Sequence, residues 1–197
     1  MAKRLGCVIV LLGFVASGCL EGRGDGNERS AAQSQPANAD ATTLQDFQRR
    51  VDQYVKVRNE LKKQSAPLKE TKDAGKIQAS QDELADKIRA ARKDAKAGDI
   101  FTPEIKTLFR RLMYPETKGQ EGAATKEAIK EDAPTGVLIK VNAKYPDSAP
   151  LPTVPPNLLA ALPKLPEDLE YRFINRDLIL LDVYANVIVD FMPNAIR

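Results

Sequence analysis

The spacing between apolar residues changes once along this chain, and that change limits the folds that the chain can adopt. Between residues 43 and 112, apolar side chains recur every three or four positions, which places them on one face of a helix. From residue 137 onward, apolar and polar residues alternate in short runs, which is the period of a half-buried strand. We therefore predict an α+β fold, with a helical region over residues 43–132 and a proline-rich and β region over residues 133–197.

The helical region is expected to open with an antiparallel helical hairpin. Its first helix starts at Thr43, and its apolar stripe is Leu44, Phe47, Val51, Tyr54 and Leu61, with Arg58 in one slot. The second helix repeats the pattern and is expected to stop at Gly98. A third helix should begin at Thr102-Pro103, because a capping hydroxyl precedes a proline suited to the first helical position. A weaker fourth helix is expected over residues 120–131.

The β region is expected to hold a strand, a proline-rich strap and a small antiparallel β meander. The strand covers residues 137–145, and the prolines that follow enforce an extended path. Asn157 is expected to cap one or two helical turns within the strap. Three short β runs close the chain, and the middle one is apolar enough to be buried on both faces: Leu169–Ile174, Leu178–Asp182 and Val187–Met192.

The start of the chain has the three parts of a secretory signal peptide. Lys3-Arg4 precedes an apolar run over residues 7–15, and small residues precede Cys19. The apolar run is shorter than the ~20 residues that a transmembrane helix needs. The ending Ala16-Ser17-Gly18-Cys19 resembles the lipobox of bacterial lipoproteins, with Ala16 where leucine is usual. The resemblance implies that residues 1–18 are removed and that Cys19 becomes the lipidated first residue. The alternative is ordinary cleavage nearby, which leaves Cys19 as a thiol.

Lipidation of Cys19 predicts a location in the bacterial cell envelope, anchored to a membrane and facing the periplasm. Leu20 follows the cysteine, and by analogy with enterobacterial lipoproteins a residue other than aspartate there favours the outer membrane. Residues 19–42 contain, beyond the cysteine, mostly small and polar residues, so we expect a disordered tether. The expected partners are therefore the membrane, through the lipid anchor, and another protein of the envelope.

The composition argues against several classes of function. The chain has no histidine, which removes histidine metal sites and histidine-dependent nucleophilic catalysis. Its 30 Lys and Arg residues nearly balance its 27 Asp and Glu residues, which argues against a nucleic-acid partner. No phosphate-binding glycine loop, nucleophile elbow or paired-cysteine site is present. We therefore expect a protein that is not an enzyme, with no cofactor and no metal.

A second resemblance concerns the C-terminal residues. Leu165-Pro166, Tyr171, Asp177-Leu178-Ile179-Leu180, Asp182 and Val187-Ile188-Val189-Asp190 together resemble the β module of small periplasmic proteins, some of which are tied to nickel and cobalt homeostasis. The resemblance implies a small exported β module. No metal function is carried over, because the chain has no histidine and Cys19 is expected to be lipidated.

One set of residues in this module could carry chemistry. Asp177, Asp182 and Asp190 come from neighbouring turns and strands, and converging carboxylates can hydrolyse glycosides or bind calcium. Alternatively, carboxylates at strand ends cap turns or face water.

Two functions remain open. We favour a non-enzymatic protein-binding or envelope-structural lipoprotein, which should show an exposed apolar patch or an open strand edge. A small periplasmic ligand-binding protein or carboxylate-dependent enzyme should instead gather carboxylates with raised pKa values in a pocket.

Overall fold

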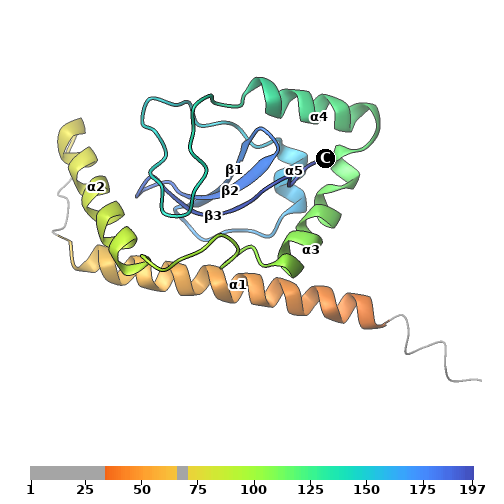
Figure 1. The fold of residues 1–197 in the computed structure, drawn as a ribbon, viewed down its shortest axis with the longest axis horizontal. Coiled ribbons are helices and arrows are strands. Elements are labelled where there is room, and N and C mark those ends of the chain that lie inside the picture. Colours follow the sequence, from red (N-terminus) through yellow and green to blue (C-terminus); the bar gives the residue numbers. More distant parts are fainter. Residues whose placement is uncertain (1–33, 66–70) are drawn as a thin grey trace, which may run out of the picture. The chain divides into compact units, whose positions relative to one another are not determined.

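The computed structural model describes residues 34–65 and 71–197 of the chain. The predicted signal peptide, Cys19 and most of the predicted tether lie outside the described residues. Residues Pro36–Arg197 form one compact unit, which holds the α+β fold that follows. Its elements are shown in Figure 1: α1 (Ser34–Lys63), α2 (Ala74–Ala91), α3 (Pro103–Met113), the 3-10 turn η1 (Pro115–Thr117), α4 (Gly119–Glu131), α5 (Pro156–Ala161), β1 (Leu169–Ile174), β2 (Asp177–Asp182) and β3 (Val187–Met192).

The three strands form one antiparallel sheet in the order β1-β2-β3, which confirms the predicted meander. In β1 and β2, Leu169 lies opposite Asp182 and Ile174 lies opposite Asp177. The pairing of β2 with β3 contains one irregularity, between Leu180 and Leu181. The meander is compact because each of its tight connections contains an asparagine with positive φ, a conformation that asparagine tolerates better than most residues.

The central strand β2 is buried on both faces, as its apolar sequence predicts. Leu178 and Leu180 face a large core shared with the helices, whereas Ile179 and Leu181 face a smaller core with Tyr145. The alternation follows from the two-residue period of a strand. The sheet is therefore held between two apolar layers.

The helices close the larger core with aromatic side chains. Phe47 of α1, Phe101 before α3 and Phe109 of α3 are all fully buried. The Phe47 ring centroid lies 4.9 Å from that of Phe109 and 6.0 Å from that of Phe101. Such ring pairs add about 0.5–1.5 kcal/mol each beyond the burial of their area. Within the described residues, no helix has both the length and the apolar character needed to cross a bilayer.

The start of α3 confirms the predicted cap. The Thr102 side chain accepts a hydrogen bond from the Ile105 amide at 3.4 Å, and Pro103 occupies the first helical position. The two helices of the predicted hairpin, α1 and α2, and the predicted fourth helix, α4, are also present.

Three predicted helix ends are wrong. The first helix begins at Ser34, and Thr43 lies inside it, where its hydroxyl donates to the Ala39 carbonyl. The residues before Thr43 are helical because the stretch is rich in alanine and because Asp40 forms an ion pair with Arg111 of α3. The predicted tether over residues 19–42 is therefore helical from Ser34 onward. The second helix ends at Ala91 instead of reaching Gly98.

The third wrong end concerns α5. Asn157 does not cap this helix, because the helix begins one residue earlier, at Pro156, and the Asn157 side chain donates to Glu116 Oε2 at 3.1 Å. Pro155 occupies the capping position and makes no side-chain cap.

The strand predicted at residues 137–145 is absent. Burial does alternate there, since Val141 and Tyr145 are buried and Leu138 is exposed. Asn142, however, has φ of +64° and lies in a turn, and only Lys144 makes an isolated bridge to β3. The turn forms because the Asn142 side chain donates to the main-chain oxygen of Arg92 at 2.6 Å. A period of two therefore predicted which side chains are buried, but not the hydrogen bonding of the main chain.

Candidate binding site

The structure does not bring the three predicted carboxylates together. Asp177 and Asp182 stand at opposite ends of β2, about 16 Å apart at the usual rise of a strand. Asp177 accepts a hydrogen bond from the Asn194 amide at 2.8 Å and so fixes the turn near the end of the chain. Asp190 lies in β3 and has partners of its own. Within the described part of the chain, no group of three or more His, Cys, Asp or Glu residues is placed to hold a metal ion.

The Asp182 carboxylate joins the sheet to α1. It is fully buried and accepts hydrogen bonds from the Tyr54 hydroxyl at 2.8 Å, from Arg58 Nε at 2.9 Å and from the Ala185 amide at 2.9 Å. Arg58 is 4% exposed, and its Nη2 also donates to Asp168 at 2.6 Å. Burial, together with the nearby Asp182 charge, raises the pKa of Tyr54 well above its ordinary value. The arginine that interrupts the apolar stripe of α1 is therefore the charge partner of a buried acid.

The Asp190 carboxylate organises the segment between α2 and α3. It is fully buried and accepts four main-chain hydrogen bonds, from Gly98 at 3.0 Å and from Ile100, Phe101 and Phe191 at 2.8 Å each. These bonds turn the chain at Gly98 and place Phe101 in the core just before the cap of α3. With its acceptor positions taken up by amides, Asp190 is not placed to act on a ligand.

A groove along β1 is a concave surface with a mostly apolar lining. It has a volume of about 750 Å³ and lies between β1 and the proline-rich strap over residues 151–165. Its lining includes four consecutive residues of β1: Leu169, Glu170, Tyr171 and Arg172. Successive side chains of a strand point to opposite faces. A groove lined by four in a row must therefore run along the edge of the strand.

The main chain of β1 shows which groups face this groove. The Asp168 carbonyl accepts a hydrogen bond from the Val183 amide at 2.9 Å, so at Asp168 the main chain faces the β2 side. The side to which the main-chain N–H and C=O groups point alternates from residue to residue along an antiparallel strand. Those of Leu169 and Tyr171 therefore point away from β2. The Tyr171 carbonyl there accepts a bond from Arg172 Nη1 at 3.0 Å. The Tyr171 amide has no acceptor within the described residues.

The opposite edge of the sheet is already covered. The Asn142 amide donates to the Ile188 carbonyl at 2.8 Å, and the Ile188 amide donates to the Ala143 carbonyl at 2.9 Å. Arg92 Nη2 also donates to the Val189 carbonyl at 3.0 Å. The edge of β1 is therefore the one with which no other strand of the described residues pairs, and its residues Leu169 and Tyr171 are themselves 4% and 2% exposed.

The strap gives the groove an apolar wall. Leu151 and Leu159 are 51% and 50% exposed, a large fraction for leucine side chains, and both line the groove. The Tyr171 hydroxyl donates to the Pro163 carbonyl at 3.1 Å and so ties the strap to β1. Arg172 Nε is buried without a hydrogen-bond partner in the described structure. The outward Leu169 amide donates to the Pro166 carbonyl at 3.2 Å, so the groove combines apolar side chains with one main-chain amide of β1, that of Tyr171, that has no acceptor in the described residues.

The sequence held only a partial signal for this site. It showed an extended proline-rich segment between apolar residues, but not the strand against which that segment lies. No protein-family model, no curated protein and no solved structure matches this chain.

Proposed function

We propose that this chain is an exported, lipid-anchored protein of the bacterial cell envelope that binds an extended segment of another protein along the edge of β1. The observation that carries the proposal is the groove itself, in which a strand edge faces an apolar strap. No catalytic step is part of the proposal, because Asp182 and Asp190 are fully buried and hydrogen-bonded within the fold.

Strand addition accounts for both walls of the groove. An added strand would donate to and accept from the outward main chain of β1, while its alternate side chains would reach the apolar wall. Leu151 and Leu159 offer apolar contact on that wall. The partner segment is therefore expected to be extended, free of proline at the positions that pair, and apolar at alternate residues.

Arg172 supports this reading of the edge. Its guanidinium covers the Tyr171 carbonyl and also forms an ion pair with Glu170. A charged side chain laid over a strand edge prevents uncontrolled pairing between copies of a protein. In the complex, an amide of the partner strand would replace Arg172 at the Tyr171 carbonyl.

The test of the site compares two exposed leucines. A photoreactive amino acid is placed at Leu159, in the groove, or at Leu138, which is 69% exposed and does not line the groove. After irradiation of intact cells, position 159 should crosslink a protein that position 138 does not.

A peptide that spans the crosslinked segment should then bind the purified full chain. Leu159→Asp should weaken that binding about tenfold or more, because a carboxylate loses hydration in an apolar site. Leu138→Asp should leave the affinity unchanged. Identical crosslinks from both positions, or equal affinities for both variants, would overturn the proposal.

The lipid anchor has a separate test. Cells that express the wild type or Cys19→Ala are labelled with a palmitate analogue. Label should enter the wild type and be lost in the variant. Absence of label from the wild type would refute the anchor while leaving the binding site to be judged by the crosslinks.

A further inference from the structure

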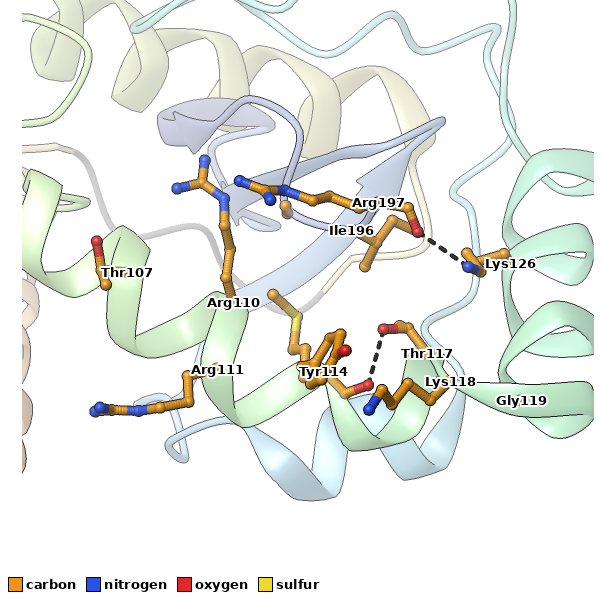
Figure 2. Close-up of a pocket in the computed structure, with 12 residues that line it drawn as sticks. Thr107, Arg110, Arg111, Tyr114, Thr117, Lys118, Gly119, Lys126, Ile196 and Arg197 are labelled. Atoms are coloured by element: carbon orange, nitrogen blue, oxygen red, sulfur yellow. Dashed lines mark hydrogen bonds between the residues drawn. The ribbon is translucent and has the colours of Figure 1, made fainter.

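A second concave surface lies apart from the groove, between α3, α4 and the last residues of the chain (Figure 2). It has a volume of about 590 Å³. Five of its lining residues carry a positive charge, and none is Asp or Glu: Arg110, Arg111, Lys118, Lys126 and Arg197. This surface, the basic cavity, shares no residue with the groove along β1.

Of the five cations, Arg111 has an acidic side chain as its partner in the described residues, whereas Lys126 and Arg110 donate to main-chain oxygens. Arg111 forms an ion pair with Asp40 of α1, outside the cavity. Lys126 Nζ donates to a main-chain oxygen of Arg197 at 3.0 Å, as Figure 2 shows. Arg110, Lys118 and Arg197 form no ion pair with a carboxylate in the described part of the chain. Three positively charged side chains from three different segments therefore line one cavity without an ion pair to an acidic side chain of the described residues.

Arg110 is held in position for an anion. Its Nε donates to the Asn194 carbonyl at 3.1 Å and its Nη2 donates to the Pro193 carbonyl at 3.0 Å. These acceptors are neutral, so the charge persists, and Nη1 has no hydrogen bond within the described residues. Fixing a guanidinium in advance reduces the side-chain entropy that is lost when a ligand binds.

Lys118 and Tyr114 form the opposite wall. The Lys118 ammonium lies 4.4 Å from the centre of the Tyr114 ring, a cation–π distance. The Tyr114 side chain lines the cavity and is 56% exposed. The ring holds the ammonium at the cavity but, being neutral, leaves its charge in place.

We propose that the basic cavity binds a phosphate group, either the head group of an anionic phospholipid or a soluble phosphate compound. Concave surfaces lined by one sign of charge concentrate ions of the opposite sign. A carboxylate is satisfied by one arginine fork, whereas a phosphate presents more oxygens and more charge to several cations at once. The basic cavity offers such a group several cations and no acidic side chain, with Arg110 and Arg197 at one end and Lys118 at the other (Figure 2).

Calorimetric titration of the full chain with inorganic pyrophosphate at low ionic strength tests the phosphate chemistry. We expect binding that weakens about tenfold with Arg110→Gln and with Lys118→Gln, since hydrogen bonds to charged groups are worth about 1.5–3 kcal/mol. Lys140→Gln is the matched control, because Lys140 is exposed and lies outside the cavity. Lys118→Gln also keeps the test valid if Arg110→Gln disturbs the fold.

Vesicles separate the two sources of phosphate. Sedimentation of the full chain with phosphatidylglycerol vesicles is compared with sedimentation with phosphatidylcholine vesicles, so that apolar insertion contributes equally to both. If more protein sediments with phosphatidylglycerol than with phosphatidylcholine vesicles, and this excess is lost in Lys118→Gln but not in Lys140→Gln, the lipid head group is the ligand. If pyrophosphate binds but no such excess is seen, the ligand of the basic cavity is a soluble phosphate compound.

The proposal is overturned if neither probe binds or if Lys140→Gln weakens binding as much as the cavity variants do. Leu159→Asp in the groove should leave phosphate binding unchanged. Failure of the groove and failure of the basic cavity are therefore distinguishable.

Discussion

Asp190→Ala offers the sharpest test of a structural role for the buried carboxylates. The change removes the acceptor for the Ile100 and Phe101 amides, at residues that are 4% and 0% exposed. Each buried donor left without a partner costs about 1–3 kcal/mol, so the two together cost about 2–6 kcal/mol. The amides of Gly98 and Phe191 also lose their acceptor but are less buried, and they add less. We expect a loss of about 4 kcal/mol in the free energy of unfolding.

The assay is urea unfolding of the full chain followed by far-ultraviolet circular dichroism, since the chain has no tryptophan. A loss of about 4 kcal/mol lowers the melting temperature of a domain of this size by about 8–16 °C. Asp177→Ala is the matched control, because Asp177 accepts one exposed main-chain hydrogen bond, from Asn194. We expect the control to lose about 1 kcal/mol or less. Equal losses for the two variants, or a loss below about 1 kcal/mol for Asp190→Ala, would refute the reasoning.

Three further predictions concern the core and the charge pair beneath it. Arg58→Met should destabilise the fold by about 3–5 kcal/mol in urea unfolding, because Asp182 stays buried without its counter-charge; a loss under about 1 kcal/mol contradicts this. Tyr54 has a raised pKa, so its contribution is fully present below about pH 10, where unfolded tyrosine ionises, and is lost above it. The free energy of unfolding of Tyr54→Phe should therefore fall less steeply with rising alkaline pH than that of the wild type. An equal slope for the two proteins argues against the prediction. Phe109→Ala should cost about 3–5 kcal/mol, measured by thermal melting.

Local signals in the sequence predicted much of the fold. The cap of α3 depends on Thr102 and Pro103, which are adjacent, and both residues act as their chemistry predicts. The meander was predictable because its turn residues and its apolar runs lie within a few positions of each other. In both cases, the residues that specify an element also form it.

Predictions failed where the partner of a residue lies far away in the chain. The turn at Asn142 depends on Arg92, and the path of the chain after α2 depends on the bonds that Asp190 accepts from residues 98, 100 and 101. Neither contact produces a periodic pattern in the sequence. Arg58 in the apolar stripe of α1 was the clearest sign of a distant partner, and its spacing alone did not identify Asp182.

The candidate site was hidden from the sequence for the same reason. The proline-rich strap and the apolar residues of β1 are each visible in the sequence, but the groove exists only because the Tyr171 hydroxyl and the strap lie together. The predicted carboxylates attracted attention as acids at strand ends. The burial of Asp182 and Asp190 could not be foreseen, because Arg58 and the amides of residues 98, 100 and 101, which bind them, come from other elements.

The most direct measurement of the central claim is amide hydrogen exchange at β1, with and without the peptide identified by crosslinking at Leu159. The Tyr171 amide faces the groove and has no acceptor within the described residues, whereas the Arg172 amide faces β2. Strand addition predicts that exchange at Tyr171 slows in the complex while exchange at Arg172 changes little. If the peptide binds and exchange at Tyr171 stays the same, the partner does not add to this edge, and the account of the groove is contradicted.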